Sequence, residues 1–140
     1  MKLSRTVSYA VQAAIQLAQA DPGATVPCSQ LAAEGRMPER FLLQVLRNLV
    51  THGILRSTRG VDGGYSLVRP PEQISLLEVI EAIEGPYDSE SSVGESEGIT
   101  AEGQLKLKDA LTQVTDTTRK QLEAIKLSQL LPPPPEEPGA

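Results

Sequence analysis

The stretch from residue 54 to residue 69 constrains the fold of this chain most strongly, because it has the pattern of two short strands joined by a glycine-rich turn. A tight turn needs backbone with positive φ, which Gly60, Gly63 and Gly64 adopt without steric cost. Residues that favour strands stand on both sides of this turn. They are Ile54 and Leu55 before it, and Tyr65 and Leu67 after it. The sequence therefore predicts a β-hairpin.

Arginines lie along this hairpin. Arg59 adjoins Gly60 at the expected tip, where a side chain of this type can enter a minor groove and its negative potential. Arg56 and Arg69 lie further from the tip, in positions suited to phosphate contacts. Many glycine-rich hairpins are plain connectors, but the arginines give this one the character of a DNA-binding wing.

Two helices are expected immediately upstream. The first spans residues 28–35, begins near Pro27 and ends at Gly35, a residue suited to a left-handed cap. The second begins at Pro38 and stops at Gly53. Its apolar residues share one face. They are Phe41, Leu42, Val45, Leu46 and Leu49. Helix, turn, helix and hairpin in this order predict a winged helix-turn-helix.

The opposite face of the second helix carries residue types that contact base edges and phosphates in a major groove. Alone, such a face is typical of any solvated helix, and the adjacent hairpin favours DNA binding. The predicted DNA contacts are Lys2, Arg5, Arg36, Pro38, Glu39, Arg40, Leu43, Gln44, Arg47, Arg56, Ser57, Arg59 and Gly60. Double-stranded DNA is the predicted partner.

The charge distribution agrees with this prediction, although the net charge of −5 does not suggest a DNA-binding protein. Residues 1–71 hold eight Lys or Arg against four Asp or Glu, a balance of +4, and residues 72–140 carry the remaining −9. A basic head on an acidic body favours one face for a polyanion and repels it from the other, which orients docking.

The first helix is expected from about residue 4 to residue 20. Its apolar side is formed by Val7, Val11, Ala14, Ile15 and Ala18. Polar residues interrupt this segment, and no run of about 18 apolar residues exists anywhere, so no membrane partner is expected. A single cysteine forms no internal disulfide, which fits a cytoplasmic protein.

The chain after the hairpin divides into three further parts. Residues 1–86 form the expected DNA-binding domain, closed by a helix whose capping box is Ser75 to Glu78 and which ends at Gly85-Pro86. Residues 87–104 are rich in Ser, Glu and Gly and predict a flexible acidic loop. Residues 105–131 predict a long helix, and residues 132–140 a disordered proline-rich tail.

The long helix carries an apolar stripe with spacings of three and four residues. Its members are Leu107, Leu111, Val114, Thr118, Leu122 and Ile125. Such a stripe requires a surface to cover it, either the helix's own domain or a second copy of the chain. The predicted fold class is therefore mainly α with a small β-hairpin: a winged helix-turn-helix plus a long C-terminal helix for dimerisation.

Several short motifs together resemble the Rrf-two family of bacterial transcription regulators. They are Met1-Lys2-Leu3-Ser4, Tyr9-Ala10, Phe41-Leu42-x-Gln44, Arg56-Ser57-x-Arg59-Gly60-x-x-Gly63-Gly64-Tyr65, Arg69-Pro70-Pro71 and Glu84-Gly85-Pro86. The similarity covers about residues 1 to 131. It implies a homodimer, paired through the long helix, that binds a palindromic operator, usually as a repressor. It also implies a changed operator, because the family often has glutamate at position 43, whereas Leu43 suits a thymine methyl.

Relatives of the IscR and NsrR type hold an iron-sulfur cluster through three cysteines in the loop before the long helix. The corresponding positions here fall near Val93, Ile99 and Leu105, which are apolar. Such clusters require soft thiolate ligands, so no cluster, metal or other cofactor is expected. The resemblance is closer to the cluster-free, CymR-like branch, in which a regulatory protein or thiol chemistry provides control. Simple packing is the expected role of the apolar trio, and lining a small-effector pocket is the alternative.

Cys28 is a candidate redox sensor, because a helix N-terminus stabilises a thiolate and lowers its pKa. The competing interpretation is a small buried apolar side chain. His52 is expected to cap helix carbonyls or face water. No grouping of residues predicts catalysis, so the chain is not expected to be an enzyme. The alternative to a DNA-binding regulator is a winged-helix protein-interaction module that has lost DNA affinity.

Overall fold

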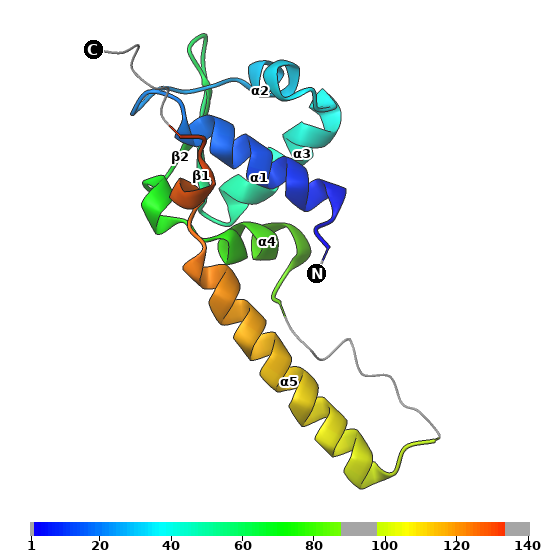
Figure 1. Ribbon diagram of the computed structural model, residues 1–140. Helices are drawn as coiled ribbons and strands as arrows, with labels where there is room; N and C mark the ends of the chain where they lie inside the picture. Colours follow the sequence, from blue (N-terminus) through cyan, green and yellow to red (C-terminus); the bar gives the residue numbers. More distant parts are fainter. Residues whose placement is uncertain (1, 88–97, 134–140) are drawn as a thin grey trace, which may run out of the picture.

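The computed structural model describes residues 2–87 and 98–133, in which helices predominate and a single hairpin provides the sheet. Figure 1 shows a head formed by the first four helices and the hairpin, from which the last long helix projects. In chain order the elements are α1 Arg5–Ala18, α2 Cys28–Gly35, α3 Glu39–Thr51, β1 Leu55–Thr58, β2 Gly64–Leu67, the 3₁₀ turn η1 Pro71–Gln73, α4 Leu76–Glu84, α5 Ala101–Ala124 and the 3₁₀ turn η3 Leu127–Leu130. The predicted mainly α fold with a small hairpin is confirmed.

The core of the head lies where α1 packs against α3 and α4. Helix α1 buries a different face from the predicted one: its buried residues are Val7, Ala10, Ala13, Ala14 and Leu17. Val11, Ile15 and Ala18 are only half-buried. Both stripes fit the helical period, and the packing selects the alanines because their small side chains allow neighbouring helices to approach closely.

The turn between α2 and α3 corrects one prediction, and the start of α3 corrects another. The left-handed residue is Arg36, with φ 54° and ψ 48°, whereas Gly35 lies inside α2. Space around Gly35 is tight: a Cβ there would lie 2.6 Å from the end of the Met37 side chain and 2.7 Å from that of Gln12 on α1, so these side chains would have to move. In α3, Phe41 does not join the buried face, being 42% exposed and packed edge-on against Tyr9.

Helix α4 begins as predicted, because the Ser75 hydroxyl accepts a hydrogen bond from the Glu78 backbone N–H at 3.1 Å. The reciprocal half of the expected capping box is missing. The Glu78 carboxylate instead accepts from the Arg69 guanidinium at 2.8 Å. The predicted end at Gly85, which has φ 85°, is confirmed.

Helix α5 differs from the predicted 105–131 at both ends. It begins at Ala101 because the Thr100 hydroxyl caps the Gly103 N–H at 3.1 Å, and it ends at Ala124. The chain then turns extended, and Leu127 donates its N–H to the Ile74 carbonyl at 2.9 Å, which ties this segment to the head. Most of the predicted acidic loop and proline-rich tail lies outside the described residues. Within the described ranges, no helix is long and apolar enough to span a bilayer.

Candidate nucleic-acid interface

The hairpin is held against the segment that leads into α2. Strands β1 and β2 pair antiparallel, with Arg56 opposite Ser66. Val26 then pairs with Tyr65 through two backbone hydrogen bonds of 3.0 and 2.9 Å, and the Thr25 hydroxyl donates to the Asp62 carbonyl at 2.6 Å. This isolated β-bridge was not predicted, although Val26 precedes a proline, a position biased towards extended backbone. It fixes the direction in which the hairpin projects.

The three glycines of the hairpin have different roles: positive φ is confirmed at Gly60 and Gly64, with φ 157° at Gly64, and is wrong at Gly63. Gly60 has φ 116° at the tip, and a Cβ at this position would have no other atom within 4 Å. At Gly63, a Cβ would lie 2.4 Å from the Thr58 carbonyl oxygen. At Gly64, it would lie 2.5 Å from the backbone carbon of Val26. The last two positions are therefore occupied by glycine because backbone passes too close for any side chain.

Helix α3 presents a polar stripe to solvent on the side opposite its core face. Arg40, Gln44 and Arg47 are exposed at spacings of four and three, which place them on one side of a helix. Behind them, Leu42, Val45, Leu46 and Leu49 are buried and orient the helix. Arg47 also lies near β2, where its charge lowers the pKa of Tyr65 against the stronger effect of burial, which raises that pKa. Helix α3 and the hairpin therefore adjoin.

The arginines of the head fall into two groups. Arg69 forms an ion pair with Glu78 and also donates to the Gln73 carbonyl at 2.9 Å, so its guanidinium already has intramolecular partners, and its phosphate contact stays a prediction. By contrast, Arg40, Arg47 and Arg59 form no ion pair with any carboxylate of residues 2–87 and 98–133. Their exposed charges are available to an external polyanion.

All of the predicted DNA contacts except Leu43 are exposed on the surface of the head, and Leu43 is half-buried. The exposed members are Lys2, Arg5, Arg36, Pro38, Glu39, Arg40, Gln44, Arg47, Arg56, Ser57, Arg59 and Gly60. The structure also places Val61 at the hairpin tip, where this apolar side chain is fully exposed. Val61 is not among the predicted contacts, because that prediction rests on charged and polar side chains.

Cys28 lies at the junction of α2, α3 and the hairpin, where it is half-buried and its Sγ donates to the Glu39 carbonyl at 3.8 Å. Burial raises the pKa of the Cys28 thiol, and the nearby Glu39 carboxylate raises it further. The predicted lowering of this pKa by the helix N-terminus is therefore wrong, because desolvation and a neighbouring negative charge outweigh the dipole. His52 caps α3 as expected, with Nδ1 2.9 Å from the Asn48 carbonyl oxygen.

Cys28 is accordingly expected to react with iodoacetamide more slowly in the native protein than in denaturant at pH 8, because the folded state disfavours the thiolate. Because the folded state prefers the protonated thiol, Cys28 stabilises the fold at pH values below the ordinary thiol pKa. This stabilisation is lost as the pH rises through the pKa of Cys28 in the folded state. Mass spectrometry of timed, quenched samples measures both alkylation rates. Faster alkylation of the native protein would contradict the assignment.

Comparison with known proteins places this geometry in a family. The model of the Rrf2 family, described as an iron-dependent transcriptional regulator, matches residues 3–133. The chain belongs to the Rrf2 (Rrf-two) family. Members of this family are transcription regulators and not enzymes, and this Rrf2 protein is a DNA-binding regulator of the winged-helix type.

Individual relatives agree with the family match. Rv1287 of Mycobacterium tuberculosis, which carries the provisional name of an HTH-type transcriptional regulator, is 39% identical over 119 residues, covering 85% of this chain and 70% of the relative. The structure of IscR from T. potens is 27% identical, with a TM-score of 0.71 over 93% of this chain and 85% of that one. CymR, the global cysteine regulator of B. subtilis, shares the fold at 22% identity, with a TM-score of 0.73 over 93% and 95% of the two chains.

The residues of this Rrf2 protein do not fit an iron-sulfur cluster, although the family description names iron. The whole sequence has one cysteine and one histidine. Clusters are ordinarily held by several thiolates, and within residues 2–87 and 98–133 no group of three or more His, Cys, Asp and Glu is placed to hold a metal ion. Of the apolar trio, Ile99 and Leu105 are 39% and 64% exposed, so their expected packing is not observed, and Val93 lies outside the described residues.

Proposed function

We propose that this Rrf2 protein is a homodimeric repressor that binds a palindromic operator, with α3 in the major groove and the hairpin tip in the adjacent minor groove. The observation that carries the proposal is a set of exposed arginines on one head that form no ion pair with any carboxylate of residues 2–87 and 98–133. Arg40 and Arg47 lie on α3 and Arg59 on the hairpin, whereas Arg69 and Arg119 are paired with glutamates. Unpaired cations on adjoining elements suit the closely spaced phosphates of one duplex.

Helix α5 supplies the proposed dimer contact. Its C-terminal end packs on its own head: Leu122 is buried with Val7, Leu77 and Ile80, and Arg119 forms an ion pair with Glu81 at 3.2 Å. Leu122 is therefore withdrawn from the predicted seam, and Ile125 lies beyond the helix end and is half-buried. The proposed seam consists of Leu107, Leu111, Val114 and Thr118, on the part of α5 that projects from the head in Figure 1.

The uneven distribution of charge along the chain supports the proposed orientation on DNA. With the arginines on the head and the excess of acid after residue 71, a duplex is attracted to α3 and the hairpin and repelled from the body. A dimer built on α5 joins two such heads. Binding of both to one duplex face requires half-site centres about 34 Å apart, one turn of DNA.

Arg59→Ala is expected to weaken operator binding by about 1 kcal/mol or more, roughly fivefold, because it removes one groove contact while leaving the fold untouched. Arg59 is exposed at the hairpin tip and makes no ion pair within residues 2–87 and 98–133, so its loss costs no intramolecular contact. A gel-shift titration at fixed salt measures the change, on a duplex chosen from the parent protein by selection from random sequence.

Lys108→Ala is the matched control, since it removes one exposed positive charge from α5, away from the head. Its affinity for the duplex should equal that of the parent. Parent binding should also fall steeply with salt, as phosphate contacts require. An Arg59→Ala protein that binds as tightly as the parent would remove the hairpin tip from the interface, and a flat salt dependence would reject the DNA face as a whole.

A further inference from the structure

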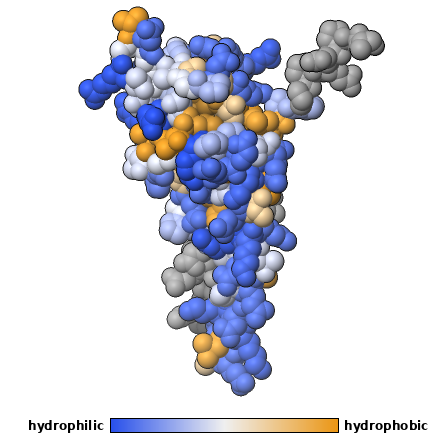
Figure 2. Space-filling view, turned by 90° about the vertical axis from the view of Figure 1, so that its left-hand side faces the viewer, coloured by the Kyte–Doolittle hydropathy of each residue, from blue (hydrophilic) through white to orange (hydrophobic). Residues whose placement is uncertain are grey.

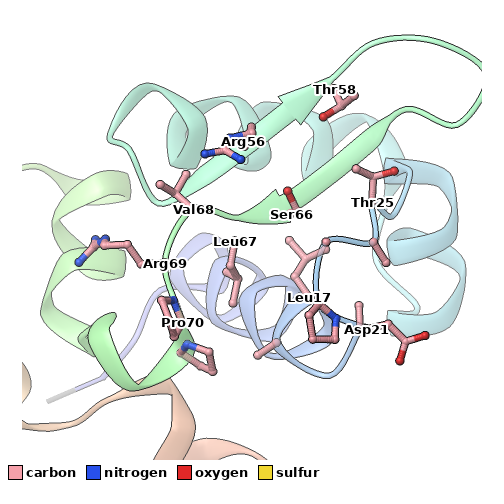
Figure 3. Close-up of a pocket in the computed structure, with 16 residues that line it drawn as sticks. Leu17, Asp21, Thr25, Arg56, Thr58, Ser66, Leu67, Val68, Arg69 and Pro70 are labelled. Carbon is pink, nitrogen blue, oxygen red and sulfur yellow. The ribbon is translucent and has the colours of Figure 1, made fainter.

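A pocket of about 550 Å³ lies beside the hairpin, on the face away from the core. Strand side chains alternate between faces, so Arg56, Thr58 and Ser66 point to the pocket side while Leu55 points into the core. The opposite wall is the C-terminal end of α1 with the loop that follows it, and Pro70 and Pro71 close one end (Figure 3). A volume of this size is typical of small-molecule sites.

The walls of the pocket combine an apolar surface with a few polar groups. Leu17, Leu67 and Val68 line it together with Pro70 and Pro71. Val68 is 39% exposed and Leu67 is half-buried, whereas Leu17 belongs to the buried core, so the solvent-facing apolar surface is that of Val68 and Leu67. The face drawn in Figure 2, the left-hand side of Figure 1, shows hydrophobic side chains gathered over the head and a mostly hydrophilic α5 below. An apolar wall around few polar groups favours an amphipathic ligand.

The polar groups of the pocket differ in what they offer a ligand. Arg69 is held by Glu78 and the Gln73 carbonyl, and the Thr25 hydroxyl is used by Asp62. Arg56, in contrast, forms no ion pair with any carboxylate of the described ranges. Its planar guanidinium, directly across the strand pair from Ser66, suits a bidentate carboxylate.

We propose that this pocket binds a small organic monocarboxylate, with the carboxylate on Arg56 and the apolar body against Leu67 and Val68. Asp21 lines the pocket at the edge far from Arg56, and its negative charge disfavours a doubly charged phosphate while tolerating a single negative charge placed at Arg56 (Figure 3). The occupant is therefore a monoanion with an apolar part.

The position of Arg56 gives the site a regulatory consequence, which rests on the proposed function. A carboxylate on Arg56 occupies a guanidinium that the duplex would otherwise engage and adds a negative charge beside the hairpin. Ligand and operator therefore bind antagonistically, and each weakens the other by the same factor. This is control by a small effector, with no need for a metal or thiol reaction.

The test uses the full chain and hexanoate and benzoate as probes, with hexanamide and benzamide as uncharged controls of matched shape. Isothermal titration without DNA is expected to show saturable binding of a carboxylate below about 10 mM and at least tenfold weaker binding of its amide, a difference of about 1.4 kcal/mol. Arg56→Gln removes the charge, and Ala18→Leu fills the pocket from α1. Each should weaken carboxylate binding at least about tenfold.

Ala18→Leu also separates the two proposals, because Ala18 is not among the DNA contacts. This variant should bind the selected duplex as the parent does but lose the antagonism by carboxylate. Absence of binding by both carboxylates at about 10 mM, or binding unchanged in both variants, would overturn the pocket. Carboxylate binding that these variants weaken, in a protein that binds no duplex, would retain the pocket and reject the proposed function.

Discussion

Replacing Leu111 and Val114 together by glutamate is expected to convert the proposed dimer into monomers. Val114 is 62% exposed and Leu111 half-buried in the isolated chain, and the two lie on one side of α5. If these residues form the dimer contact, the double variant would bury four carboxylates in an apolar interface. Burying an unpaired charge costs free energy, so the dimer should be weakened. We expect the dissociation constant to rise at least about 100-fold, equivalent to about 2.7 kcal/mol.

Sedimentation velocity across a concentration series measures the change. Leu105→Glu with Gln113→Glu is the control, because both residues are exposed on α5 and lie away from the seam while the added charge is the same. Circular dichroism should show helix retained in both variants. A parent that sediments as a monomer would reject the dimer, and a seam variant that remains dimeric would place the interface elsewhere.

Gly64→Ala is expected to lower both the stability of the head and its affinity for DNA. The new Cβ would lie 2.5 Å from the Val26 backbone carbon and 2.6 Å from the Val26 oxygen, which are backbone atoms with little room to move. Relief of this overlap separates β2 from Val26 and breaks the two hydrogen bonds between Val26 and Tyr65. We expect a loss of about 2 kcal/mol in the free energy of unfolding.

Urea denaturation and the gel-shift titration test the two effects. Gly53→Ala is the control, since Gly53 has φ 75° but no atom within 4 Å of the added methyl. It should cost about 1 kcal/mol through backbone strain alone and leave DNA affinity nearly unchanged. A Gly64→Ala protein as stable as the parent would show that the approach of β2 to Val26 is easily relaxed.

Local sequence patterns predicted the structure correctly where a short segment determines its own conformation. The bounds of α2 are the predicted ones, and the end of α4 at Gly85 is confirmed, because caps, glycines and prolines act within a few residues. The hairpin follows from its glycines and strand formers in the same way. The division into domains and the DNA contacts residue by residue remain predictions.

Predictions failed where the outcome depends on a distant part of the chain. The capping box predicts that Glu78 bonds back to Ser75, whereas its carboxylate pairs with Arg69 at the end of the hairpin. The pKa of Cys28 followed from burial and from Glu39, eleven residues away, rather than from its own helix end. Leu122 fits the apolar stripe of α5 but packs into its own head.

The sequence by itself determined the order of helices and hairpin, the excess of basic over acidic residues in 1–71 and the lack of thiolates for a cluster, because these depend on residue identity and short spacing. Only the tertiary structure decided which arginines are unpaired, how far α5 folds back on the head, and that Arg56 borders a pocket. Each of these depends on which side chains meet across long sequence separations, and there competing partners of similar energy are resolved by packing.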